Sequence, residues 1–163
     1  MKMKLVPVLA LLCVCVLGGC TIPAQLYPVQ GPLASQTPPP IFSAKITGGV
    51  SPQTISTVLS NGETFAGTWV VPSQKARAQS AAAGKPAPTN LAIAWDTVYG
   101  QGFYSAHVLG AKFFAQSAIT GDQGTVLQVE IYRPVDDAPD TNILQSIKGV
   151  AQDSHGNIYK LVL

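Results

Sequence analysis

The chain has 163 residues, of which 47% are hydrophobic and 11% are charged, and its formal net charge is +2. This length predicts one small domain, and the apolar fraction excludes a fully disordered chain. The near balance of charges gives no basic patch of the kind that binds nucleic acid.

Residues 1–19 have the pattern of a cleaved signal peptide. Lys2 and Lys4 form a short positive region, and an uncharged apolar run follows from Leu5 to Leu17. This run is shorter than the roughly 20 residues that a membrane-spanning helix needs. We therefore predict a targeting segment and not a transmembrane anchor.

Small residues and a cysteine follow the apolar run. Leu17-Gly18-Gly19-Cys20 resembles the lipobox of bacterial lipoproteins, in which the signal peptide is cut before an invariant cysteine. The resemblance implies that Cys20 becomes the lipidated first residue of the mature chain. Because two or three acyl chains on one residue anchor a protein stably, the expected partner is a membrane. The next residue is Thr21 and not Asp, which by resemblance to enterobacterial sorting favours the outer membrane, on its periplasmic face. In a Gram-positive source the same anchor would lie on the plasma membrane.

Cleavage changes the cysteine content and the charge of the chain. Of its three cysteines, Cys13 and Cys15 leave with the signal peptide and Cys20 is blocked by lipid. No thiol then remains for a disulfide, a metal site or a nucleophile. Ten basic residues accompany eight acidic ones, so the loss of Lys2 and Lys4 makes the mature chain formally neutral.

Residues 20–40 are expected to form a lipidated, Pro-rich tether. The segment has no charged residue and many prolines, which fix φ and remove backbone donors. The folded domain is predicted to begin near Ile41 and to extend to residue 163.

A hairpin is predicted in the first part of this domain. Residues 41–47 form one strand, and residues 54–59 and 64–71 flank Asn61-Gly62. Asn-Gly tolerates positive φ at both central turn positions and is the strongest short hairpin signature. Gly67 lies between two aromatic residues on one strand face, which indicates a close approach or a bend.

The middle of the chain combines an insertion with one helix. Residues 72–90 are rich in Pro, Ala, Ser and Gly and are predicted to form a flexible insertion. Residues 91–99, with Asn90 as a candidate cap, place apolar side chains on one helical face, and Gly100 offers a stop. Alternating apolar residues in the same stretch also fit a strand, but we favour the helix.

The C-terminal third has the clearest alternation of strands and turns. An apolar run is expected to contain one strand, and a second hairpin is expected around Ser154-His155-Gly156. The predicted strands are part of 108–119, 125–132, 146–151 and 157–163, with turns at 121–124 and 154–156.

Together these elements predict a mainly β domain over residues 41–163, either a small antiparallel sandwich or a partly open barrel with one short helix. The mature chain resembles small proteobacterial lipoproteins without an assigned activity. They share the Pro-rich leader, a hairpin like that at Asn61-Gly62, a turn like that at 120–125 and a strand like that at 156–159. The resemblance supports the fold and implies no chemistry.

The candidate catalytic residues fit no familiar motif. His107 lies in an apolar segment and is expected in the core, whereas His155 is expected on an exposed turn. A cell-wall-associated hydrolase would require Asp96, Glu130 and His107 to converge in an open cleft. No nucleophile elbow or zinc motif is present, and the acidic residues at 136–140 lack the spacing of a calcium loop. We therefore expect no metal, no cofactor and no catalytic residue.

Aromatic residues are the remaining candidates for a site. Most of them are expected to fill the core of a small β-rich domain. Trp95, Tyr99 and Phe103 would line a cavity between sheet and helix if the chain bound a ligand. The full cluster consists of Trp69, Trp95, Tyr99, Phe103, Tyr104, Phe113 and Phe114.

We expect a membrane-anchored envelope lipoprotein that is not an enzyme and has a structural or protein-binding role, with an envelope protein as a candidate partner. The alternatives are a small apolar ligand-binding lipoprotein and a cell-wall-associated hydrolase.

Overall fold

A computed structural model describes residues 21–47, 53–73, 91–111, 113–134 and 146–163. The described chain is mainly β, with one short helix and one π-helical segment. The strands are β1 (Thr21–Gln30), β2 (Phe42–Thr47), β3 (Thr54–Val58), β4 (Thr64–Thr68), β5 (Phe113–Thr120), β6 (Val126–Arg133), β7 (Lys148–Asp153) and β8 (Ile158–Val162). The helix α2 spans Ala92–Tyr99, and the π-helical segment η1 spans Tyr104–Val108.

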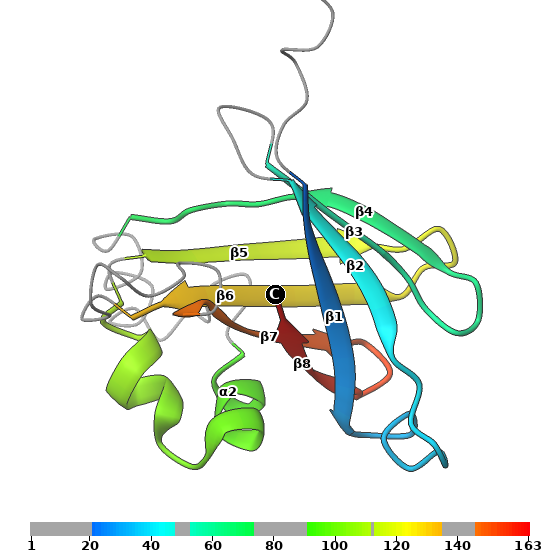
Figure 1. The fold of residues 1–163 in the computed structure, drawn as a ribbon, viewed down its shortest axis with the longest axis horizontal. Coiled ribbons are helices and arrows are strands. Elements are labelled where there is room, and N and C mark those ends of the chain that lie inside the picture. The colour runs from blue at the N-terminus through cyan, green and yellow to red at the C-terminus, as the bar shows by residue number, and fades with distance from the viewer. Residues whose placement is uncertain (1–20, 48–52, 74–90, 112, 135–145) are drawn as a thin grey trace, which may run out of the picture.

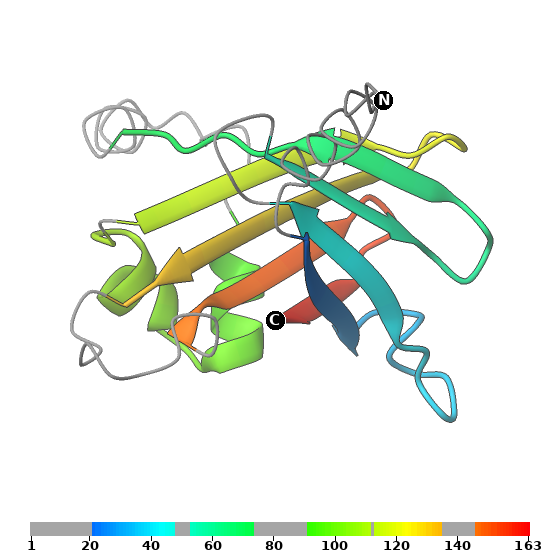
Figure 2. The ribbon, with the colours of Figure 1, turned by 45° about the horizontal axis from the view of Figure 1, so that its top comes forward.

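The strands form one antiparallel sheet that curls into a nearly closed barrel (Figures 1 and 2). Their order is β4-β3-β2-β1-β8-β7-β6-β5, so strands that follow one another in the chain pair except at β4 and β5, and β1 also pairs with β8. Figure 2 shows β4 lying along β5, where a single bridge joins Val70 to Gln116. The predicted mainly β fold with one short helix is confirmed, and the barrel is the correct one of the two architectures.

The first half of the segment expected to be a tether is a strand of this barrel. β1 begins at Thr21, directly after Cys20, and lies between β2 and β8. Ala24 and Leu26 point into the barrel core, as the period of two requires. The predicted tether over residues 20–40 is therefore wrong for residues 21–30, and the domain begins before Ile41.

The prolines of β1 occupy places where the sheet does not need their missing donors. Pro23 lies ahead of Gln25, the first residue that pairs with β8, so β2 is its only partner strand. Pro28 lies at a register shift in the pairing with β8. Strand ends and bulges are the positions at which a sheet tolerates proline, which explains how a Pro-rich segment forms a central strand.

Two apolar clusters lie on opposite faces of the sheet. The inner cluster fills the barrel with buried side chains from every strand. The outer cluster lies on the outer face of β5–β8, which α2 and η1 cover. Trp95 is at its centre. A Cβ on Gly67 would lie 2.6 Å from Cγ1 of Ile119, which confirms the predicted close approach. Gly100 ends α2 with a φ of 110°, and the helix predicted over residues 91–99 is confirmed.

The up-and-down order gives the barrel two different ends. The connections β1–β2, β3–β4, β5–β6 and β7–β8 lie at one end, which we call the hairpin end. The start of β1, the end of β8, the ends of β2, β4 and β6 and the starts of β3, β5 and β7 lie at the opposite end, which we call the open end. In Figure 1 the chain enters β1 at the top of the molecule, where β2, β3 and β4 converge.

Candidate functional site

The open end carries four half-buried apolar side chains, which we call the mouth residues. Ile22 is the second residue of β1, Trp69 follows β4, Ile147 precedes β7 and Leu163 follows β8. All four pack against the inner cluster while remaining partly exposed. Because the four strands run in alternating directions, these residues reach the same end of the barrel. No local sequence pattern predicts this group, because its four members are far apart in the chain.

A row of threonines crosses the sheet beside the mouth residues. Thr21 pairs with Thr47, Thr47 with Thr54 and Thr54 with Thr68. The hydroxyls of Thr47 and Thr54 lie 2.6 Å apart, and the indole N–H of Trp69 donates to the Thr54 carbonyl at 3.3 Å. The open end therefore combines partly exposed apolar side chains with short hydroxyl side chains.

Three turns at the hairpin end have the same hydrogen-bond pattern. In the β3–β4 turn, the N–H of Leu59 donates to the Glu63 carbonyl and the N–H of Gly62 donates to the Leu59 carbonyl. The turns at 121–125 and 153–157 repeat both bonds. The glycine at the fourth position of each turn has a positive φ: 81° for Gly62, 95° for Gly124 and 83° for Gly156.

This pattern corrects one detail of the predicted Asn-Gly turn. The hairpin exists where the sequence predicted it, but Ser60 and Asn61 occupy the central turn positions and Gly62 follows them. This arrangement is a type I turn with glycine at its fourth position, followed by a bulge, and not a two-residue turn centred on Asn-Gly. The Asn61 side-chain oxygen accepts from the backbone N–H of Glu63 at 3.0 Å, which fixes the turn.

A buried carboxylate fixes the β5–β6 turn to the β3–β4 hairpin. Glu63 is fully buried, and its Oε1 accepts from the backbone N–H groups of Gln123 at 3.2 Å and Thr125 at 2.8 Å. Its Oε2 accepts from the Thr125 hydroxyl at 2.6 Å and the Asn61 amide at 3.4 Å. Burial opposes ionisation, but these hydrogen bonds outweigh it and hold the pKa of the Glu63 carboxyl below its ordinary value. Glu63 is therefore a structural group.

A second buried carboxylate organises the β7–β8 turn. Oδ1 of Asp153 accepts from the backbone N–H groups of His155 and Asn157, both at 2.9 Å. Its Oδ2 accepts from the Asn157 amide at 2.8 Å and the Tyr159 hydroxyl at 2.6 Å. Burial and the bond to Asp153 raise the pKa of Tyr159 far above its ordinary value. The Asn157 side chain also accepts from the N–H of Leu33, which connects this turn to the β1–β2 loop.

The aromatic residues proposed for a ligand cavity stack on one another. The ring centroid of Trp95 lies 5.5 Å from that of Tyr99 and 6.0 Å from that of Phe103. The ring centroids of Tyr99 and Phe103 are 4.9 Å apart. The indole N–H of Trp95 donates to Oε2 of buried Glu130 at 2.7 Å, and the N–H of Leu91 donates to its Oε1 at 3.3 Å. These contacts attach α2 to the outer face of the barrel.

The three groups suggested for a hydrolase have different surroundings. Oδ1 of Asp96 accepts from the N–H of Tyr104 at 2.9 Å, and bonds from residues 102–104 outweigh burial and hold the pKa of Asp96 below its ordinary value. Glu130 lies under Trp95. His107 is exposed, and its ring lies 4.7 Å from that of Phe103, so the prediction of a core histidine is wrong. Asp96, Glu130 and His107 therefore contact different neighbours: Tyr104, Trp95 and Phe103.

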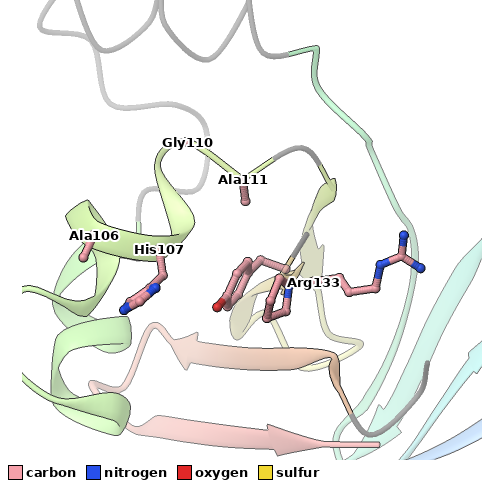
Figure 3. Close-up of a pocket in the computed structure, with 7 residues that line it drawn as sticks. Ala106, His107, Gly110, Ala111 and Arg133 are labelled. Atoms are coloured by element: carbon pink, nitrogen blue, oxygen red, sulfur yellow. The ribbon is translucent and has the colours of Figure 1, made fainter. Parts of the chain in front are cut away.

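A hollow of about 260 Å³ lies between η1 and the end of β6. His107, Tyr132 and Arg133 are its polar or charged lining residues, and the side chain of Arg133 extends away from His107 (Figure 3). The remaining lining is small or apolar: Ala106, Gly110, Ala111 and Pro134. This composition offers no set of converging polar groups that would define a chemistry.

Several predictions lie outside the described residues. These are the signal peptide with Cys20, Asn90, most of the 72–90 insertion and the acidic residues at 136–140. His155 is exposed on its turn, as predicted. Within the described ranges, no cluster of His, Cys, Asp and Glu is arranged to hold a metal ion, and no helix is long and apolar enough to cross a membrane.

The chain matches no protein-family model, no curated protein and no solved structure.

Proposed function

We propose that the protein is a lipid-anchored lipoprotein of the bacterial envelope, which acts through structural or protein-binding contacts and not by catalysis. The observation that carries the proposal is Leu17-Gly18-Gly19-Cys20 at the end of a complete signal-peptide pattern. The eight strands found in the described part of the chain all follow Cys20, so cleavage before Cys20 would remove none of them. Thr21 favours the periplasmic face of the outer membrane.

The hairpin end suits a protein-binding role. Asn61, Gln123 and His155 are exposed at the tips of the three similar turns, whereas Glu63 and Asp153 fix the turn backbones from below. A surface that is already ordered loses little conformational entropy when it binds a partner. The stacked aromatic residues and Glu130 then have a structural role, because they attach α2 to the barrel.

The anchor is tested by labelling cells with a palmitate analogue and separating their membranes. We expect the wild-type chain and Cys15→Ser to be labelled and to remain with the membranes, because Cys15 lies within the apolar run. Cys20→Ser should lose the label and leave the membrane fraction. Labelling and fractionation of Cys20→Ser like the wild type would exclude the proposed anchor.

The protein-binding role is tested separately in intact cells. A photo-crosslinking residue at Gln123 should form a discrete adduct with an envelope protein, whereas the same residue at Ser56, on the side of the barrel, should not. Equal adducts from both positions, or none from Gln123, would argue against binding through the hairpin end.

A further inference from the structure

The open end is attached to Cys20 without a spacer. Thr21 is the first residue of β1 and is paired with Thr47 of β2. Because a strand advances only about 3.3 Å per residue, a group on the preceding residue lies within a few ångströms of the sheet. A lipid on Cys20 would therefore hold the open end close to a bilayer and leave the barrel little freedom to stand away from it.

The side chains at this end have the chemistry of a membrane interface. The mouth residues Ile22, Trp69, Ile147 and Leu163 present partly exposed apolar surface. Val70 and Val71 follow Trp69 and are 56% and 54% exposed. Tryptophan is enriched at the boundary between headgroups and acyl chains, where a ring can be apolar on one side and hydrated on the other.

Polar groups next to the mouth residues match the headgroup layer. The threonine row from Thr21 to Thr68 borders the mouth residues with hydroxyl groups. Lys45, the register partner of Pro23, is exposed close to this row and is suited to anionic headgroups. At the opposite end, the exposed turn tips are polar, with Asn61, Gln123 and His155.

We propose that the open end of the barrel rests on the lipid bilayer, with the mouth residues and Val70–Val71 in the headgroup region. This inference rests on the proposed lipid anchor and adds an orientation to it. The hairpin end then faces away from the membrane, where its turns are accessible to a partner. The membrane contact involves surface side chains only, and the barrel itself remains outside the acyl layer.

The two tryptophans of the chain provide a test of this orientation. The lipidated protein is reconstituted in vesicles of phosphatidylethanolamine and phosphatidylglycerol, with or without bromine atoms near the headgroup end of the acyl chains. Bromine quenches only nearby indoles. Trp95 is fully buried between α2 and the sheet and serves as the internal reference. We expect quenching of the wild type, and loss of that quenching in Trp69→Phe.

Labels at exposed positions give a second measurement that does not alter the core. Val71→Cys and Gln123→Cys each carry a single environment-sensitive dye, because the sulfur of Cys20 is occupied by lipid. The dye at position 71 should shift to the blue and be quenched by the brominated lipid, whereas the dye at position 123 should behave as in water.

The outcomes separate the orientation from the anchor. If the protein floats with the vesicles but position 71 and Trp69 are no more quenched than position 123 and Trp95, the proposed orientation is wrong and the anchor stands. If the mature protein carries no lipid and does not float with the vesicles, the proposed anchor is wrong, and the orientation falls with it.

Discussion

The hydroxyl of Thr125 donates a 2.6 Å hydrogen bond to Oε2 of Glu63. This bond joins the β5–β6 turn to the β3–β4 hairpin at the seam of the barrel. Within the described residues, β5 is joined there by one bridge, from Gln116 to Val70, which follows β4. Asp122 reinforces the same junction, because its Oδ1 accepts from the N–H of Thr64 and its own N–H donates to the Thr64 carbonyl. The buried pair of Glu63 and Thr125 and the exposed Asp122 therefore hold the barrel closed where the sheet is weakest.

Acid should weaken this closure through Glu63. Because the pKa of its carboxyl is lowered in the folded state, its stabilising contribution is complete above the pKa of the unfolded chain, about 4.3. That contribution is lost as the pH falls through the lower folded-state pKa. We expect the urea midpoint of the wild type to fall below pH 4.5 more steeply than that of Glu63→Gln, measured by circular dichroism. Parallel pH profiles would contradict this role of Glu63.

Gly67→Ala should destabilise the barrel by about 1–3 kcal/mol, the usual cost of overpacking a core. The added methyl would lie 2.6 Å from Cγ1 of Ile119, which is itself buried in the inner cluster of the barrel. Gly110→Ala is the matched control, because nothing lies within 4 Å of a Cβ at that position. The free energies of unfolding from urea titrations should separate the two variants, and equal values would show that the close approach is relaxed in solution.

Tyr159→Phe should lower the free energy of unfolding by about 1–3 kcal/mol, because it removes a buried donor to the Asp153 carboxylate. Tyr27→Phe is the control, since the Tyr27 hydroxyl bonds at the surface to Gln25, and a change within about 0.5 kcal/mol is expected there. Equal effects in the two variants would argue that the Asp153 network contributes little.

Trp95→Phe should cost about 1–3 kcal/mol, because Glu130 would lose one of its hydrogen bonds inside the outer cluster. Trp69→Phe should cost less, since the indole of Trp69 is only half-buried and its bond to the Thr54 carbonyl is longer. Near-ultraviolet circular dichroism and urea unfolding measure both variants. A larger loss of unfolding free energy for Trp69→Phe than for Trp95→Phe would contradict this expectation. It would show that the indole at the open end stabilises the fold more.

Local patterns were sufficient for most strands. β2, β3, β6 and β8 lie within or almost within the predicted ranges, and the turns at Gly62, Gly124 and Gly156 lie where glycine indicated them. Alternation of side chains and the conformational freedom of glycine depend on residues a few positions apart. The prediction of a tether over residues 21–30 was wrong, although a local pattern also indicated a strand there. The proline content was given more weight than the alternation of Ile22, Ala24 and Leu26.

The sequence by itself determined the mainly β composition, the short helix, the turn positions and the signal-peptide pattern ending at Cys20, since each depends on neighbouring residues. Only the tertiary structure decided that β1 closes against β8, that Glu63 is buried beside Thr125 and that Ile22 and Leu163 pack against the same inner cluster of a barrel. Those relationships join residues far apart in the chain, and the free energy of burying them together belongs to the whole sheet and not to any single segment.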